Sequence, residues 1–179
     1  MDYSLEDFCA DGRATLAKDQ GDSGRERICK DLEKLLLNAN FIAKYLSDDS
    51  PSGMHPIYED ADYGFMVLTY KMPDARVSPP HDHGDSWAIY GQVSAYTDMT
   101  VWQPAAADDD KLEAVKNYRL NPGMAGVYHP GDIHSIDYPA GSTFVRVTGK
   151  DLSKVARKVF DPDTNSVTIV ESLGTGHKS

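Results

Sequence analysis

The feature that most constrains the fold is a series of short segments, rich in β-branched and aromatic residues, that follows residue 53. Pro, Gly and Asp separate most of these segments, as turns separate strands. Seven short strands at this spacing are typical of a β-sandwich or a barrel. The segments are GFMVLTYK (64–71), SWAIYGQ (86–92), AYTDMTVWQ (95–103), LEAVKNYRL (112–120), AGVYH (125–129), STFVRVTG (142–149) and SVTIV (166–170).

The first 48 residues predict helices instead. One helix is expected from about Leu5 to Lys18. A second is expected after Ser23 and Glu26, which fit a capping box. Apolar residues from Ile28 to Leu46 recur at helical spacing and form one stripe, which must be buried against the rest of the chain. We therefore expect two N-terminal helices packed on the outside of a barrel.

The length of 179 residues allows one structural domain with a sizeable core. Within it we expect a helical extension over residues 1–48, a β-barrel over 54–171 and a flexible tail over 172–179. The stretch AAADDDK (105–111) is expected to be a solvated loop, either at a hairpin tip or as an insertion.

The charge balance bears on partners and location. The net charge of −10 disfavours nucleic acid and anionic membranes, since both are anionic. No apolar run approaches the roughly 18 residues of a membrane span. The start, MDYSLEDFCADG, lacks the basic and apolar regions of a secretory signal. Cys9 and Cys29 are therefore expected to be reduced thiols, and the protein is expected to be cytoplasmic.

Three of the six histidines have the spacing of a metal site. His81 and His83 are two residues apart in an extended-looking segment, so both side chains point the same way. Two such imidazoles can converge on one ion. A third ligand must come from another strand, and HPGDIHSID (129–137) offers His134 after a Gly turn. We therefore expect one metal ion on His81, His83 and His134.

These residues resemble the two motifs of the cupin superfamily. The first motif carries HxH, here His81-Asp82-His83, and the second carries Gly-x-x-His, here Gly131-Asp132-Ile133-His134. Pro130 and Gly123 resemble further parts of the second motif, and the resemblance covers roughly residues 64–150. It implies a mainly β fold, the cupin double-stranded β-helix or jelly-roll barrel.

The chain lacks the Glu that many cupins supply four or five residues after the second histidine, where Trp87 and Ala88 stand. This three-histidine pattern resembles the cysteine dioxygenase and 3-mercaptopropionate dioxygenase group, and the dioxygenases that cleave acetylacetone. The resemblance implies Fe(II) that binds an anionic substrate together with O2. Histidine also suits Zn, Ni and Mn, which stay as alternatives.

The chain departs from the thiol dioxygenases at a late strand. Those enzymes carry Ser-x-His-x-Tyr there, whereas the matching segment, residues 144–148, has neither the His nor the Tyr. It has Arg146, at a position where the resemblance implies a pocket residue. An arginine inside a barrel needs a partner, either a substrate carboxylate or a structural salt bridge. We take Arg146 as the candidate substrate anchor, with Arg76 as a weaker one.

Other candidates are weaker. Asp85 could replace the missing Glu, but a solvated turn residue is the stronger interpretation. His129 is expected to be a hydrogen-bonded residue at the barrel mouth, and His55 and His177 are expected on the surface. Tyr70 and Tyr128 could donate a hydrogen bond to substrate or oxygen. The remaining aromatic residues after the first motif, Trp87, Tyr90, Tyr96 and Trp102, are expected in the core, with one facing the cavity.

The first functional hypothesis is a non-haem Fe(II) dioxygenase, an oxidoreductase, acting on a small anionic molecule, either a thiol or a dicarbonyl. The alternatives are an O2-independent metal-dependent isomerase or lyase, or a non-catalytic ligand-binding cupin. The expected partners are a small-molecule substrate and O2, and a homodimer is compatible with the class. The sequence leaves open the substrate, the native metal and the oligomeric state.

Overall fold

The computed structural model describes residues 3–105 and 108–171, without the side chains of 108–110. Its helices are α1 (Leu5–Leu16), α2 (Asp22–Leu35), α3 (Ala39–Tyr45) and the 3₁₀ turn η1 (Leu152–Lys154). Its strands are β1 (Gly53–Glu59), β2 (Met66–Met72), β3 (Arg76–Val77), β4 (Ala88–Ser94), β5 (Thr97–Ala105), β6 (Asp108–Leu120), β7 (Ala125–Tyr128), β8 (Ile133–Tyr138), β9 (Ser142–Thr148), β10 (Arg157–Asp161) and β11 (Ser166–Val170).

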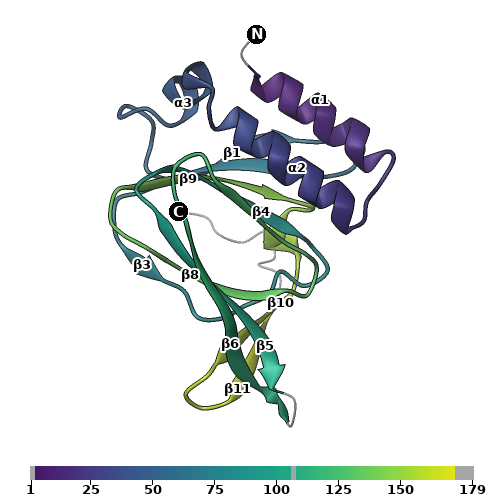
Figure 1. Cartoon of the computed structure of the whole chain (residues 1–179), viewed down its shortest axis with the longest axis vertical. Helices are drawn as coiled ribbons and strands as arrows, with labels where there is room; N and C mark the ends of the chain where they lie inside the picture. Colours follow the sequence, from purple (N-terminus) through teal and green to yellow (C-terminus); the bar gives the residue numbers. More distant parts are fainter. Residues whose placement is uncertain (1–2, 106–107, 172–179) are drawn as a thin grey trace.

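The strands form two main antiparallel sheets (Figure 1). One has the order β1-β2-β9-β4-β7 and the other the order β3-β8-β5-β6. Strands that are neighbours in a sheet come from distant parts of the chain, as β9 lies between β2 and β4. Such crossing between two facing sheets is the arrangement of a jelly roll. The expected fold class, a mainly β jelly-roll barrel with helices on the outside, is confirmed.

Strand β9 shows how the barrel separates its two faces. Val145 and Val147 are fully buried in the apolar cluster that contains the helices. Phe144 and Arg146 alternate with them and line a cavity on the inner side. Side chains on one face of β9 therefore pack with the helices, and side chains on its other face line the interior cavity.

The helices cover the outer face of the five-stranded sheet, as Figure 1 shows for α1 and α2. The helices approach the sheet closely at Gly91 of β4. A Cβ atom placed there would lie 2.8 Å from methyl groups of both Leu32 and Leu36. Leu32 is fully buried and Leu36 nearly so. The glycine therefore lets the helical layer approach the backbone of β4 directly.

The helices differ from the sequence expectation in two details. The second helix begins at Asp22, with Gly21 at the N-cap and no side-chain capping bond, so the capping box expected at Ser23 and Glu26 is wrong. The stripe from Ile28 to Leu46 is not one helix. It is divided at Asn38, whose side chain accepts hydrogen bonds from the amides of Asn40 and Phe41 and starts α3.

All seven expected strands are present, and β8 is the further strand that was expected to carry His134, but the expectation missed β1, β3 and β10. β1 contains Pro56, and it is an edge strand, where proline is tolerated. β10 is rich in charge and largely exposed. The loop expected over 105–111 is mostly strand, since β5 runs to Ala105 and β6 begins at Asp108. The tail expected over 172–179, with His177, lies outside the described residues.

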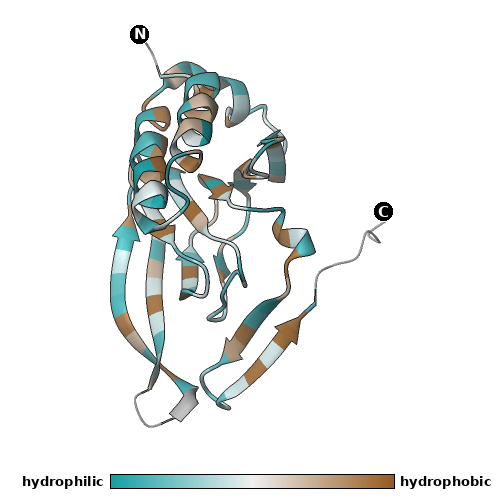
Figure 2. Cartoon of the chain, turned by 90° about the vertical axis from the view of Figure 1, so that its right-hand side faces the viewer, coloured by the Kyte–Doolittle hydropathy of each residue, from teal (hydrophilic) through white to brown (hydrophobic). Residues whose placement is uncertain are grey.

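Two hairpins, β5–β6 and β10–β11, project from the barrel (Figure 2). They are joined by side chains, since Phe160 of β10 packs in one cluster with Leu112 of β6. Hydrophobic and hydrophilic residues alternate along both, as Figure 2 shows. In β10 this alternation brings Val159 toward the barrel, where it forms an isolated bridge with His81. The β10–β11 hairpin is thereby joined to the segment of the HxH motif.

Cys9 and Cys29 are buried and form no disulfide with each other. Burial raises the pKa of each thiol to about 12, so both stay protonated at neutral pH. Within residues 3–105 and 108–171, the longest apolar helical stretch falls short of what a bilayer crossing requires.

Candidate metal centre

His81 lies directly opposite His134 of β8, in an antiparallel bridge. Side chains of opposed residues leave the backbone on the same side, and the two ring centroids are 4.6 Å apart. His83 completes the group, with its ring 5.2 Å from that of His81 and 5.0 Å from that of His134. The structure therefore brings together the three histidines expected from the sequence.

His83 is positioned by a turn that its neighbours stabilise. One oxygen of the Asp82 carboxylate accepts hydrogen bonds from the backbone amides of Gly84 (3.1 Å) and Lys158 (2.8 Å). Gly84 has a φ of +58°, and a Cβ atom there would lie 2.3 Å from the carbonyl oxygen of Ala156. The HDHG sequence thus contains two ligand candidates and two residues that hold the turn against the loop before β10.

One nitrogen from each of the three histidines lies within 4.8 Å of the other two, and all three residues are buried. A metal–nitrogen bond is about 2.1 Å long, so a small inward movement lets the three nitrogens share one ion. The group could therefore hold a metal ion.

The electrostatics of the site favour neutral imidazoles. Burial is the main cause of the low pKa of His83 and of His134, which both lie well below the ordinary value. Nearby positive charge, including that of Arg146, lowers them further. The pKa of His81 is also lowered, first by burial. Neutral histidines keep the lone pair that a metal requires.

The hydrogen bonds of the histidines leave nitrogen atoms available. Nδ1 of His81 lies 2.9 Å from the carbonyl oxygen of Pro79, which fixes the proton on Nδ1 and frees Nε2. Nε2 of His83 and Nε2 of His134 lie 3.1 and 3.4 Å from the same oxygen, the hydroxyl of Tyr90. One hydroxyl has a single proton, and the Nδ1 atoms of both rings are buried without a partner among the described residues. Coordination of a metal ion through the Nε2 atoms would use the lone pairs that this single proton cannot satisfy together, so the three histidines fit a metal ion.

Tyr90 lies beside the three histidines, and the sequence did not single it out. Its register explains its position, because Tyr90 of β4 pairs with Arg146 of β9, and both face the interior. The only indication in the sequence was that Tyr90 stands two residues after Ala88, so that the two side chains share one face of the strand. Tyr128, by contrast, stacks on His134 with centroids 3.9 Å apart, and its hydroxyl bonds to that of Tyr118.

A cavity of about 470 Å³ opens beside the histidines. His81 and Tyr90 form the wall shared with the metal centre, and Tyr70, Tyr138 and Phe144 supply aromatic surface. A volume of this size accommodates a small organic molecule. The cavity is therefore a suitable substrate site adjoining the three histidines.

Arg146 lies in this cavity with no salt bridge. No carboxylate oxygen of the described residues lies within 4.0 Å of its guanidinium, and its Nε is buried without a partner there. Its guanidinium carbon lies 5.0 Å from the centre of the Tyr70 ring, a cation–π contact. The structural salt bridge that the sequence left open as an alternative is therefore not present in the described part of the chain.

The remaining candidates lie away from the centre. The carboxylate of Asp85 is exposed and pairs with Lys150, so it does not replace the missing Glu. Nδ1 of His129 lies 3.4 Å from Asp22, outside the group of three. His55 is partly buried rather than fully on the surface, and its ring bonds to the carbonyl of Ser52.

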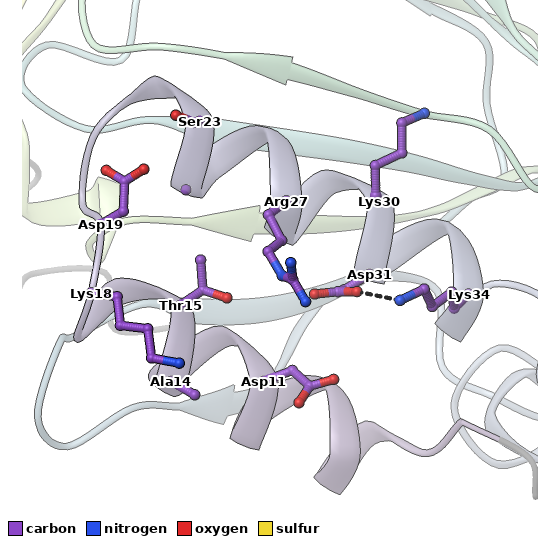
Figure 3. Close-up of a pocket in the computed structure, with 11 residues that line it drawn as sticks. Asp11, Ala14, Thr15, Lys18, Asp19, Ser23, Arg27, Lys30, Asp31 and Lys34 are labelled. Atoms are coloured by element: carbon purple, nitrogen blue, oxygen red, sulfur yellow. Dashed lines mark hydrogen bonds and ion pairs between the residues drawn. The ribbon is translucent and has the colours of Figure 1, made fainter.

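A second hollow, of about 780 Å³, lies between α1 and α2 (Figure 3). Charges of both signs line it, and Figure 3 shows Lys34 bonded to Asp31, at 2.6 Å. Ion pairs three residues apart are usual on solvated helix surfaces. The side chains here form a polar groove between two helices, on the other side of the sheet from the histidines.

No protein-family model matches the chain, and no curated protein matches its sequence. Similar solved structures include KdgF from Halomonas sp., with 18% identity and a TM-score of 0.42, over 53% of this chain and 74% of that one. They also include the cupin domain of Cnp3 from Schizosaccharomyces pombe, with 12% identity and a TM-score of 0.42, over 55% and 64% of the two chains. A pumpkin pro-11S globulin matches at 7% identity and a TM-score of 0.41, over 53% of this chain and 23% of the globulin. The assignment of the fold itself rests on the strand order and pairing described above.

Proposed function

We propose that the chain is a metal-dependent enzyme of the cupin type, with one ion held by His81, His83 and His134. The observation that carries this proposal is the meeting of three buried, neutral imidazoles beside an open cavity. A structural metal usually has all its positions filled by protein, whereas a catalytic metal keeps positions open for substrate. Three ligands facing a cavity fit the second arrangement.

The finer proposal is a non-haem Fe(II) dioxygenase acting on a small anionic molecule, either a thiol or a dicarbonyl. Three neutral ligands leave an Fe(II) ion its full 2+ charge, which favours an anionic substrate. When bound, Fe(II) would supply adjacent open positions for the substrate and O2. The resemblance of the HxH and Gly-x-x-His motifs to three-histidine dioxygenases supports this choice over other metals.

The protein's own residues would bind and orient the substrate. Arg146 would hold a carboxylate of the substrate through paired N–H donors, which fixes orientation as well as position. The Tyr90 hydroxyl, next to two of the histidines, would donate a hydrogen bond to substrate bound there or return a proton to it. Tyr70, Phe144 and Tyr138 would exclude water from the inner end of the cavity.

The alternative is an O2-independent isomerase or lyase using Zn, Ni or Mn as a Lewis acid. The position of Tyr90 is the observation that favours it, because a phenol beside a metal can transfer protons without any redox step. The same three histidines would serve either chemistry.

The proposal is tested by metal content and oxygen uptake. Protein purified without oxygen is analysed for Fe, Zn, Ni and Mn, and O2 consumption is followed with thiols and β-dicarbonyls. The variant His83→Ala should lose the metal and the uptake. His129→Ala is the matched control, since it removes a histidine outside the group and should change neither.

Iron with uptake that depends on His83 supports the dioxygenase. Zinc, nickel or manganese without uptake on any compound overturns the dioxygenase and favours the isomerase or lyase. Failure to bind any of the four metals overturns the metal-dependent enzyme altogether and leaves a ligand-binding cupin.

A further inference from the structure

We infer that the cavity beside the three histidines is built for a dianion, a substrate with a second acidic group besides the one held by Arg146. Three arginines line the cavity, namely Arg76, Arg146 and Arg157, and none of its described lining residues is acidic. The inference rests on the proposed function, because it takes this cavity as the substrate site. It extends that function by naming the class of substrate.

The three side chains reach the cavity from three different strands. In each of these three extended segments the residue two positions away lines the cavity too, while the residue between does not. The pairs are Arg76 with Ser78, Phe144 with Arg146, and Arg157 with Val159. Since side chains two apart on a strand share a face, the backbone of each strand directs its arginine inward. The convergence is therefore a property of the strand register.

The charge of the chain makes this convergence unusual. The protein has 28 acidic and 18 basic residues, so an average patch of its surface would hold more carboxylates than cations. This cavity holds three guanidinium groups, none of which lies within 4.0 Å of a described carboxylate oxygen. Three converging like charges repel one another, and an anion between them removes that repulsion.

The three arginines differ in burial, which places one at an inner position and two at an outer position. Arg146 is partly buried, with its Nε enclosed, and it lies in register with Tyr90 next to the histidines. Arg76 and Arg157 are exposed and lie at the mouth of the same cavity. One acidic group can bind at Arg146 while a second binds between Arg76 and Arg157. A monoanion would leave the outer pair without a partner.

The test compares two four-carbon ligands that differ by one carboxylate, succinate and butyrate. Their dissociation constants are measured by calorimetry on the full chain, both with metal loaded and after chelation, at constant salt. We expect succinate to bind about tenfold more tightly or better, the effect of roughly one charge-assisted contact. Arg76→Gln and Arg157→Gln should each weaken succinate and leave butyrate within about twofold, whereas Arg146→Gln should weaken both.

Lys158→Gln is the matched control for Arg157→Gln. It removes one positive charge from the next residue of β10, whose side chain does not line the cavity, and it should leave the preference for succinate unchanged. Thermal melting of each variant checks that the fold is retained. 3-Phosphonopropionate in place of succinate shows whether the outer group is better satisfied by a phosphorus acid.

Equal affinity for succinate and butyrate in the wild-type protein overturns the inference, even where metal binds normally. A loss of preference in Lys158→Gln as large as in Arg157→Gln also overturns it, since general surface charge would then explain the result. A preference for succinate that persists after chelation supports the dianion site independently of the metal. If the protein binds no metal at all and still prefers succinate, the dianion site stands while the proposed metal chemistry fails. The two proposals therefore fail separately.

Discussion

The carboxylate of Asp82 accepts a hydrogen bond of 2.8 Å from the backbone amide of Lys158, 76 residues away in the chain. The same oxygen accepts from the amide of Gly84. Asp82 stands between the two histidines of the HxH motif, so this bond ties the motif to β10. His81 is held by backbone pairing with His134, whereas His83 depends on the turn that Asp82 stabilises.

Asp82→Ala should therefore weaken metal binding by about 10- to 100-fold, the usual effect of losing a group that orients a ligand. Asp82→Asn should stay close to the wild type, since its side-chain carbonyl can accept both hydrogen bonds. The measurement is affinity for Zn by competition with a chromogenic chelator. If Asn weakens binding as much as Ala does, the charge of Asp82 matters and its role in orienting the turn is refuted.

Gly84→Ala should destabilise the protein much more than Gly131→Ala. Both glycines have positive φ, +58° and +83°, so either substitution should cost about 1–2 kcal/mol of unfolding free energy. Only at Gly84 would the new methyl group meet a backbone oxygen, 2.3 Å away in Ala156, while at Gly131 no atom lies within 4 Å. Urea denaturation of the two variants measures the difference. Equal losses of stability would mean that the loop before β10 moves aside freely.

Asp60→Asn should lower the free energy of unfolding by ~2 kcal/mol, the cost of weakening hydrogen bonds to a charged group. Asp60 is buried, and it accepts from Arg13, from the Tyr58 hydroxyl and from the amide of Tyr63. It thereby joins α1 to the turn between β1 and β2. Asp62→Asn is the control, because Asp62 is exposed and lies 3.7 Å from Arg13. It should change stability little.

The pH dependence of stability gives a second check on Asp60. Burial would by itself raise the pKa of this carboxyl, but the hydrogen bonds from Tyr63, Tyr58 and Arg13 outweigh burial and hold it below the ordinary value. The unfolded state therefore binds more protons between its own pKa, about 4, and the lower folded pKa. The stabilisation is fully present above about pH 4 and is lost as the pH falls through the folded pKa. The gap between wild type and Asp60→Asn, measured by denaturation, should narrow in acid; a constant gap would contradict this.

Tyr90→Phe should lower turnover at least tenfold on whichever compound the metal-loaded protein transforms, while affinity for the metal stays within about threefold. The hydroxyl lies within hydrogen-bonding distance of Nε2 of His83 and of His134. Tyr118→Phe, which removes a hydroxyl bonded to Tyr128 instead, is the control. Steady-state rates and metal titration together make the comparison. Unchanged turnover in Tyr90→Phe would remove this residue from the proposed chemistry.

Much of the fold followed from local pattern. The seven segments rich in β-branched and aromatic residues were expected as strands and found as strands, because such residues favour the extended backbone of a sheet. β10 was missed because its sequence, RKVFD, is largely charged, and its position is fixed by the bond to Asp82 and the bridge to His81. The break between α2 and α3 was missed because the apolar spacing continues across it, although α2 ends at Leu35 and Asn38 caps the start of α3.

The candidate site was partly visible in the same way. The two-residue spacing of His81 and His83 and the turn before His134 are local features, so the three histidines could be selected from the sequence. The position of Tyr90 beside them could not, because it depends on which of several aromatic residues falls opposite Arg146 when β4 and β9 pair. Arg157 was not selected either, because β10, the strand that carries it, was not expected. Register between distant strands is a property of the assembled barrel.

The close approach at Gly91 makes β4 the common wall of two compartments. Leu32 and Leu36 press on it from the helical side, and the neighbouring Tyr90 points from it toward the histidines. A single strand separates the helical layer from the cavity with the histidines. Substitutions in the outer helices that change the positions of Leu32 and Leu36 would therefore also move the phenol of Tyr90. Reactivity in the cavity could thus be changed by residues that no substrate contacts.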